Sequence, residues 1–150
     1  MTRGLETISA MAEPIKFHFD VYGGDFSAAG GASVVVKKKL RQLGFSPDII
    51  RKVSVAMYEG EINMVIHANG GTADVEVRDD CIMIVLADKG PGIPNVELAF
   101  TEGYSTARDD IRALGFGAGM GLPNMKKYTD EMTIDTVIGV GTTITMKVNL

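Results

Sequence analysis

The segment that most constrains the fold is the long amphipathic stretch 46–69, SPDIIRKVSVAMYEGEINMVIHAN. Ser46 is a suitable N-cap, and Pro47 would occupy the first helical position, where its missing N–H has no cost. Asn69 and Gly70 form a typical helix end. At about 100° per residue, the apolar side chains fall into two stripes. The segment is therefore predicted to be a helix with polar edges between two apolar stripes.

The rest of the chain predicts five strands and further helices. Residues 15–22 alternate apolar and polar side chains, as a strand with one buried face does. A helix is expected from the start signals Asp25 and Ser27 to the stop at Gly44, with Gly30 and Gly31 inside it. The remaining expected elements are a hairpin at 72–78 and 81–87, a short helix near 95–100, a helix beginning around 120–128, and a last hairpin at 131–137 and 142–150.

Strands joined by hairpins imply a mixed, mostly antiparallel sheet. The fold class expected is α/β, a two-layer sandwich with helices on one face of the sheet. The run 81–87 is apolar throughout, which predicts a central strand covered on both sides. Residues 1–14 are expected to be a flexible arm, and residues 15–150 a single domain.

Composition excludes several classes of function. The chain of 150 residues has a formal net charge of −4, and its densest basic run, Lys37 to Arg41, fits a solvated helix face. Nucleic-acid binding is therefore not expected. The one cysteine, Cys81, cannot form an internal disulfide and suggests a reducing compartment. No apolar run is long enough to span a membrane, and no signal sequence is recognisable, so a cytoplasmic protein is expected.

Two glutamates in the long helix differ in their surroundings. Glu61 shares a polar side with Ser54 and Tyr58 and is expected to face solvent. Glu59 and Asn63 are four residues apart, hence neighbours on one helix face, and they lie between the apolar stripes. Enclosed polar groups need partners or a cavity, so this pair is either a structural hydrogen-bond pair or a functional site. His67, near the helix end, is expected to cap or pack against the next loop.

Two glycine-rich segments follow. DKGPGIP, residues 88–94, comes directly after an apolar strand, which places Asp88 at the strand's end. GFGAGMGLPNM, residues 115–125, stands just before a predicted helix, where backbone N–H groups can bind phosphate. Each segment alone is weak support for a nucleotide site, and neither matches the P-loop pattern.

The order of these motifs is more specific. Glu59-x-x-x-Asn63, then DKGPGIP, then GMGL, then GVGTTITM resembles the GHKL (Bergerat) ATP-binding superfamily, which includes histidine-kinase ATPase domains, Hsp90, MutL and type II topoisomerases. The short loop between the glycine segments and the run EINMVIHA are most similar to the anti-sigma-factor serine/threonine protein kinases, or switch kinases. The resemblance covers roughly residues 15–148.

The resemblance implies ATP and Mg²⁺ as cofactors and a role for each matching residue. Glu59 would be the general base, and Asn63 would bind the Mg²⁺ that bridges the phosphates. Asp88 would accept a hydrogen bond from the adenine amino group. The other nucleotide-binding residues would be Gly90 and Gly92 beside the base, Gly117, Gly119, Met120, Gly121 and Leu122 at the phosphates, and Thr142 supporting the adenine site.

The function implied is a serine/threonine kinase that phosphorylates a STAS-type antagonist and so switches partner binding. The family also implies a homodimer, with a sigma factor or a phosphatase as final target. Two alternatives stay open. The chain is a non-catalytic ATP-binding regulatory module, or it is a detached histidine-kinase ATPase domain. The second is disfavoured because no helical segment that would hold a phosphoacceptor histidine precedes residue 15.

Overall fold

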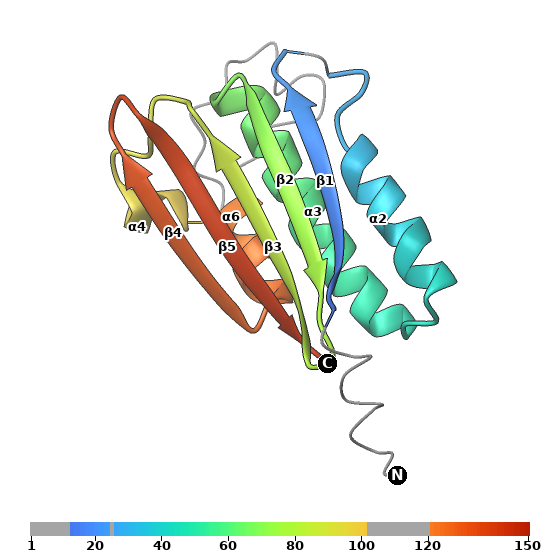
Figure 1. Cartoon of the computed structure of the whole chain (residues 1–150). Coiled ribbons are helices and arrows are strands. Elements are labelled where there is room, and N and C mark those ends of the chain that lie inside the picture. Colours follow the sequence, from blue (N-terminus) through green and yellow to red (C-terminus); the bar gives the residue numbers. More distant parts are fainter. Residues whose placement is uncertain (1–12, 25, 102–120) are drawn as a thin grey trace, which may run out of the picture.

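The computed structural model describes residues 13–24, 26–101 and 121–150, and these form a sheet with helices packed against it. The five strands are β1 (Ile15–Tyr22), β2 (Gly70–Val77), β3 (Cys81–Asp88), β4 (Glu131–Val137) and β5 (Gly141–Asn149). They lie in the order β1-β2-β3-β5-β4, and every pairing is antiparallel (Figure 1). Both predicted hairpins are confirmed, and the sheet is antiparallel rather than mixed. The predicted arm, residues 1–14, lies almost entirely outside the described residues.

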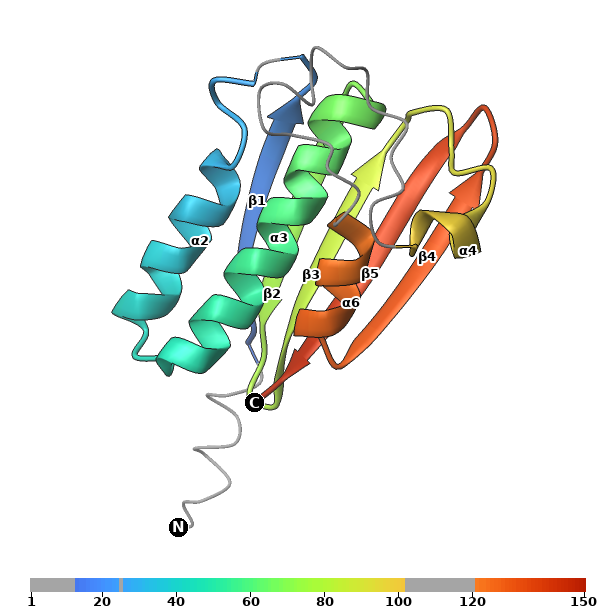
Figure 2. The same ribbon diagram turned by 180° about the vertical axis from the view of Figure 1, so that it is seen from behind.

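The helices lie on one face of this sheet (Figure 2). They are α2 (Gly31–Gln42), α3 (Pro47–His67), α4 (Val96–Ala99) and α6 (Gly121–Tyr128). The long helix is confirmed in detail, because Ser46 Oγ accepts a hydrogen bond from Ile49 N and Pro47 begins the helix. In the described part of the chain, no helix is both long and apolar enough to cross a membrane.

The core lies between α2, α3 and α6 and the helix-facing side of the sheet. Its largest fully buried side chains come from both layers: Leu40, Met57, Met125, Ile82, Ile84, Leu86 and Met146. The two-layer α/β sandwich predicted from the sequence is confirmed.

The prediction that β3 is covered on both sides is wrong. Ile82, Ile84 and Leu86 point toward the helices and are buried, whereas Met83 and Val85, which alternate with them, are only half-buried. β3 is central because β2 and β5 flank it, and flanking strands shield both edges of a strand without covering its second face.

The predicted start of α2 is also wrong. The helix begins at Gly31, and its N-cap residue Gly30 has a left-handed φ of 90° and makes no side-chain cap. Gly30 and Gly31 therefore form the boundary of the helix instead of interrupting it. Residues 26–30 are turns and bends, and Asp25 lies outside the described residues.

Candidate functional site

Glu61 does not face solvent, so that prediction is wrong. The side chain of Glu61 is 3% exposed, and both of its carboxylate oxygens accept hydrogen bonds from the first turn of α2. Ala32 N donates to Oε2 at 3.0 Å, and Ser33 N donates to Oε1 at 2.9 Å. Glu61 thus caps α2 from a different helix.

The cause lies in the packing of α2 along this side of α3. The first N–H groups of a helix have no partners within it, and that end carries a partial positive charge. Gly30 has no side chain to satisfy them, so a carboxylate from α3 does. Helical periodicity correctly places Glu61 on the same side of α3 as Tyr58. It does not reveal that α2 packs against this side. A glycine in the N-cap position was the available signal.

Glu59 and Asn63 lie on the other edge of α3, next to α6. Both are half-buried. Asn124 of α6 donates from Nδ2 to Glu59 Oε2 at 2.7 Å. Gly121, the first residue of α6, lies so close to Asn63 that an added Cβ would be 3.0 Å from its Oδ1. Among the described residues, Glu59 Oε1 and the Asn63 side chain have no hydrogen-bond partner.

The carboxylate of Asp88, at the end of β3, is hydrogen-bonded through one of its two oxygens. Its Oδ1 accepts hydrogen bonds from Gly90 N at 2.9 Å and from Thr142 N at 3.1 Å. The described residues provide no hydrogen bond to Oδ2. The carboxylate is therefore fixed in orientation by two backbone donors while half of its acceptor capacity is unused.

The loop after Asp88 is fixed between α3 and the β4–β5 hairpin. A Cβ at Gly90 would lie 2.7 Å from Ala68 Cα, and one at Gly92 would lie 2.9 Å from Val137 O. Ile93 N donates to Thr136 Oγ1 at 2.9 Å, and Thr136 Oγ1 lies 2.8 Å from Thr142 Oγ1. Only glycine allows the chain to pass this close at both points.

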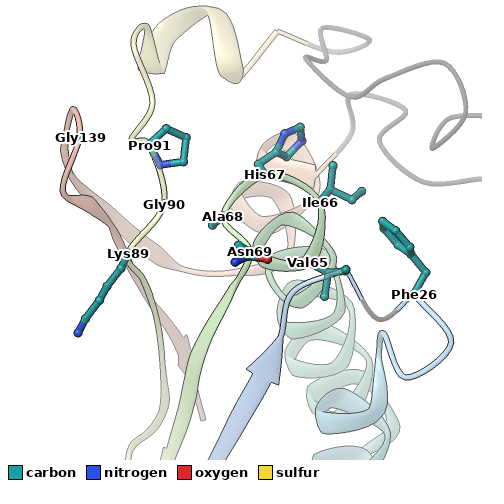
Figure 3. Close-up of a pocket in the computed structure, with 11 residues that line it drawn as sticks. Phe26, Val65, Ile66, His67, Ala68, Asn69, Lys89, Gly90, Pro91 and Gly139 are labelled. Atoms are coloured by element: carbon teal, nitrogen blue, oxygen red, sulfur yellow. The ribbon is translucent and has the colours of Figure 1, made fainter.

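An open groove of about 570 Å³ borders this loop at the C-terminal end of α3. Figure 3 shows Ile66 and His67 between Phe26 on one side and Pro91 on the other. Burial lowers the pKa of His67 from its ordinary value of 6.5. The groove extends from the loop beside Asp88 toward the segment before α2.

The structure brings together part of the predicted site. Glu59, Asn63 and Gly121 form one cluster where α3 meets α6, and Asp88, Gly90 and Thr142 form a second at the end of β3, beside the C-terminal end of α3. The Leu122 side chain is buried in the core, so a contact of this residue with a ligand would come from its backbone. Three predicted residues, Gly117, Gly119 and Met120, lie outside the described residues.

Sequence reasoning missed two participants. Asn124 bonds to Glu59, and Thr136 joins the network around Thr142. Asn124 stands in the first turn of a helix that follows a glycine-rich segment, a place where a polar side chain can face a phosphate site; that was the only available signal. Thr136 is recognisable only from the register of β4 with β5, where it pairs with Thr142.

The arrangement can support phosphate chemistry. A carboxylate with one hydrogen-bonded oxygen and an amide lie one turn apart beside a helix start. A second carboxylate lies at a strand end, and one of its oxygens has no partner among the described residues. Residues 50–150 match the family model described as "Histidine kinase-, DNA gyrase B-, and HSP90-like ATPase". The chain belongs to this ATPase family.

Similar proteins place the chain within the family. It is 31% identical to the serine/threonine-protein kinase RsbT of Bacillus subtilis over 108 residues, 69% of this chain and 75% of that protein. It is 32% identical to the anti-sigma F factor of Clostridium beijerinckii over 122 residues, 77% of this chain and 82% of that protein. The chain is therefore an ATPase-family protein kinase of the anti-sigma, switch-kinase group.

Solved structures agree in fold. The RsbU and RsbW domains of a Mycobacterium tuberculosis protein match 89% of this chain, which spans 32% of that longer chain, with a TM-score of 0.59 and 16% identity. A chain of the SiaB–SiaC complex of Pseudomonas aeruginosa matches with a TM-score of 0.54 at 9% identity, and the mycobacterial sensor histidine kinase MprB with a TM-score of 0.51 at 17% identity. The match to the SiaB–SiaC complex covers 98% of this chain and 96% of the matched chain. The match to MprB covers 90% of this chain and 97% of the matched chain.

Proposed function

We propose that this chain transfers the γ-phosphate of Mg-ATP to a serine or threonine of a STAS-type antagonist protein in the cytoplasm. The observation that carries the proposal is the edge of α3 beside α6. There a carboxylate oxygen of Glu59 and the amide of Asn63 lie one helical turn apart without a described partner. These groups therefore keep hydrogen-bonding capacity, beside a helix start, that a ligand can use.

Nucleotide binding is assigned to the second cluster and the glycine-rich segment. Asp88 Oδ2 accepts the adenine amino group, while Gly90 and Thr142 hold Oδ1 through their backbone N–H groups. Gly92 lets the loop pass close to the base. The phosphates are assigned to the backbone of Gly117, Gly119, Met120, Gly121 and Leu122, since N–H groups at a helix start favour anions.

The residues near Asn63 fit a bound Mg²⁺. The amide oxygen is a hard, neutral ligand, and Mg²⁺ in phosphoryl-transfer sites uses few protein ligands beside water and phosphate oxygens. When bound, the ion would neutralise charge on the transferred phosphoryl group. Gly121 leaves space beside Asn63 because a side chain there would meet the amide.

Glu59 is assigned as the general base. It would take the proton of the attacking hydroxyl, whose oxygen bonds to the γ-phosphorus as the bond to ADP breaks. Named relatives include a serine/threonine kinase and anti-sigma factors. In this proposal, phosphorylation would release the antagonist and switch this chain, as a homodimer, to a sigma factor or a phosphatase.

The test is transfer of ³²P from [γ-³²P]ATP to the STAS-type protein isolated with this chain from its source organism. The expected product is phosphoserine or phosphothreonine, stable in acid, and its formation should require Mg²⁺. ATP-dependent partner binding without transfer would overturn the kinase mechanism and leave a regulatory module. An acid-labile phosphohistidine would instead identify a histidine-kinase ATPase domain.

A further inference from the structure

Helices α3 and α6 approach each other closely at two points that match in spacing, one a hydrogen bond and the other a glycine packed against an amide side chain. On α6, Gly121 and Asn124 are three residues apart; on α3, their partners Asn63 and Glu59 are four apart. Both intervals are about one helical turn. The contacts therefore form two successive rungs between antiparallel helices, and each rung joins α6 to one member of the proposed catalytic pair.

The hydrogen bond of Asn124 fixes one oxygen of Glu59. An ionised carboxylate only accepts hydrogen bonds, so the amide must donate through Nδ2. The distance of 2.7 Å is that of a charge-assisted bond. The last side-chain torsion of a glutamate, which turns its carboxylate, has a broad distribution. Helix α3 does not restrict this torsion in Glu59. The donor from Asn124 of α6 does, because it holds Oε2 in place. Oε1 keeps no hydrogen-bond partner within the described ranges.

Holding the two helices together does not require this bond. Leu122 and Met125 of α6 are already buried in the core, and a Cβ at Gly60 of α3 would lie 3.4 Å from Met125 Sδ. The apolar contact between α3 and α6 is thus close-packed. The Asn124–Glu59 hydrogen bond at the edge of this contact is therefore available for another role.

We propose that Asn124 is a positioning residue that orients Glu59 for proton transfer. This inference rests on the proposed base role of Glu59. Asn124 holds Oε2, which leaves Oε1 to accept the proton of the attacking hydroxyl. Once Oε1 is protonated, Oε2 is still an acceptor, so the Asn124 bond persists through the step. The site therefore needs no rearrangement as charge moves, which is how preorganised donors lower a barrier.

Two variants separate the hydrogen bond from the shape of the side chain. Asn124→Asp is nearly isosteric, but it replaces the donor with a second carboxylate, and Asn124→Ala removes the group. In the ³²P transfer assay we expect kcat to fall roughly 10- to 100-fold in both, the scale of a misplaced reacting group. The KM and the calorimetric Kd for ATP should stay within about twofold of wild type. Lys127→Ala, at an exposed position of the same helix, is the matched control and should retain full transfer.

A double-mutant cycle with Glu59 tests whether Asn124 acts through it. In a Glu59→Gln background, adding Asn124→Ala should change transfer by no more than about twofold. An independent 10-fold loss in that background would overturn the inference, because Asn124 would then act on something else. A loss expressed only in the KM for ATP would likewise assign Asn124 to nucleotide binding.

The failure of this inference is distinguishable from failure of the proposed function. If Glu59→Gln abolishes transfer while both Asn124 variants keep the wild-type kcat, the base role stands and the positioning role is wrong. If Glu59→Gln transfers phosphate at the wild-type rate, the base role fails, and the positioning role fails with it. Unfolding midpoints measured on the same preparations identify any variant that has simply lost its fold.

Discussion

Two glutamates on α3, only two residues apart, have opposite surroundings. Glu61 lies on the α2 side, is 3% exposed, and has both oxygens bonded to backbone N–H groups at fixed distances. Glu59 lies on the α6 side, is half-buried, and has one oxygen bonded to an amide side chain. A carboxylate with both oxygens bonded to backbone donors stabilises the structure, whereas Glu59, whose Oε1 has no partner in the described ranges, can accept a proton there.

The comparison predicts that removing Glu61 has the largest effect on stability. Glu61→Ala leaves the N–H groups of Ala32 and Ser33 buried without an acceptor, and each unpaired group costs about 1–3 kcal/mol. We expect urea unfolding to show a loss of roughly 2–5 kcal/mol. Glu59→Ala, the matched control on the other face, should lose no more than about 1 kcal/mol. Equal losses would remove the distinction between the two faces.

Asp88 extends the comparison, because the described residues provide hydrogen bonds to Oδ1 of its carboxylate and none to Oδ2. In Asp88→Asn, Oδ1 can still accept from Gly90 and Thr142, so the new Nδ2 donor faces the proposed adenine amino group. Loss of a hydrogen bond to a charged group costs about 1.5–3 kcal/mol, which is roughly 10- to 100-fold in ATP affinity. Calorimetric titration should detect this, with exposed Asp79→Asn as control. Wild-type affinity in a folded Asp88→Asn variant would refute the adenine contact.

Asn63 tests the metal side of the Glu59 cluster. Asn63→Ala removes the proposed Mg²⁺ ligand but no described hydrogen bond, so the fold should be unaffected. The gain in ATP affinity on adding Mg²⁺ should shrink by several-fold, measured by titration with and without the ion. An unchanged response to Mg²⁺ would show that Asn63 is only a packing partner of Gly121.

The two histidines give the smallest expected effect and report two different surroundings, the exposed side of β1 for His18 and the C-terminal end of α3 for His67. The hydrogen bond and charge of Asp74 raise the pKa of His18 above 6.5, and burial lowers the pKa of His67 below it. The His18 contribution to stability is present below the unfolded pKa of 6.5 and is lost as pH rises through the folded pKa. The His67 environment instead destabilises the fold as pH falls from 6.5 through its folded pKa.

An NMR titration should therefore place the His18 midpoint above that of His67. Asp74→Asn should move only the His18 midpoint, toward 6.5. A common midpoint for the two histidines would contradict the described contacts.

The features of the fold and site that could be predicted from the sequence are those determined by residues close together in the chain. The α3 boundaries were predicted because Ser46, Pro47 and Asn69 act on the backbone beside them. Asp88 was placed at a strand end for the same reason. Glu61 was misplaced because its partners, Ala32 and Ser33, are 29 and 28 residues away, and helical rotation alone does not reveal which helix packs on which face.

The residues around the proposed base show the same limit. The Glu59–Asn63 pair was found from a spacing of four on one helix. Its partner Asn124 is 65 residues away, and only the packing of α6 on α3 brings the two together. The second face of β3 was misjudged for a related reason, because an apolar run does not show how many layers a sheet has.

The most direct test of the account is phosphoryl transfer and unfolding measured together on Glu59→Gln and Glu61→Gln. For Glu59→Gln we predict a loss of roughly 10²–10⁴-fold in transfer, the usual contribution of a general base, with ATP binding and stability close to wild type. For Glu61→Gln we predict a loss of about 1–3 kcal/mol in stability, with transfer per folded molecule within a few-fold of wild type. Full transfer by Glu59→Gln, or a specific loss of transfer in a stable Glu61→Gln, would contradict the account.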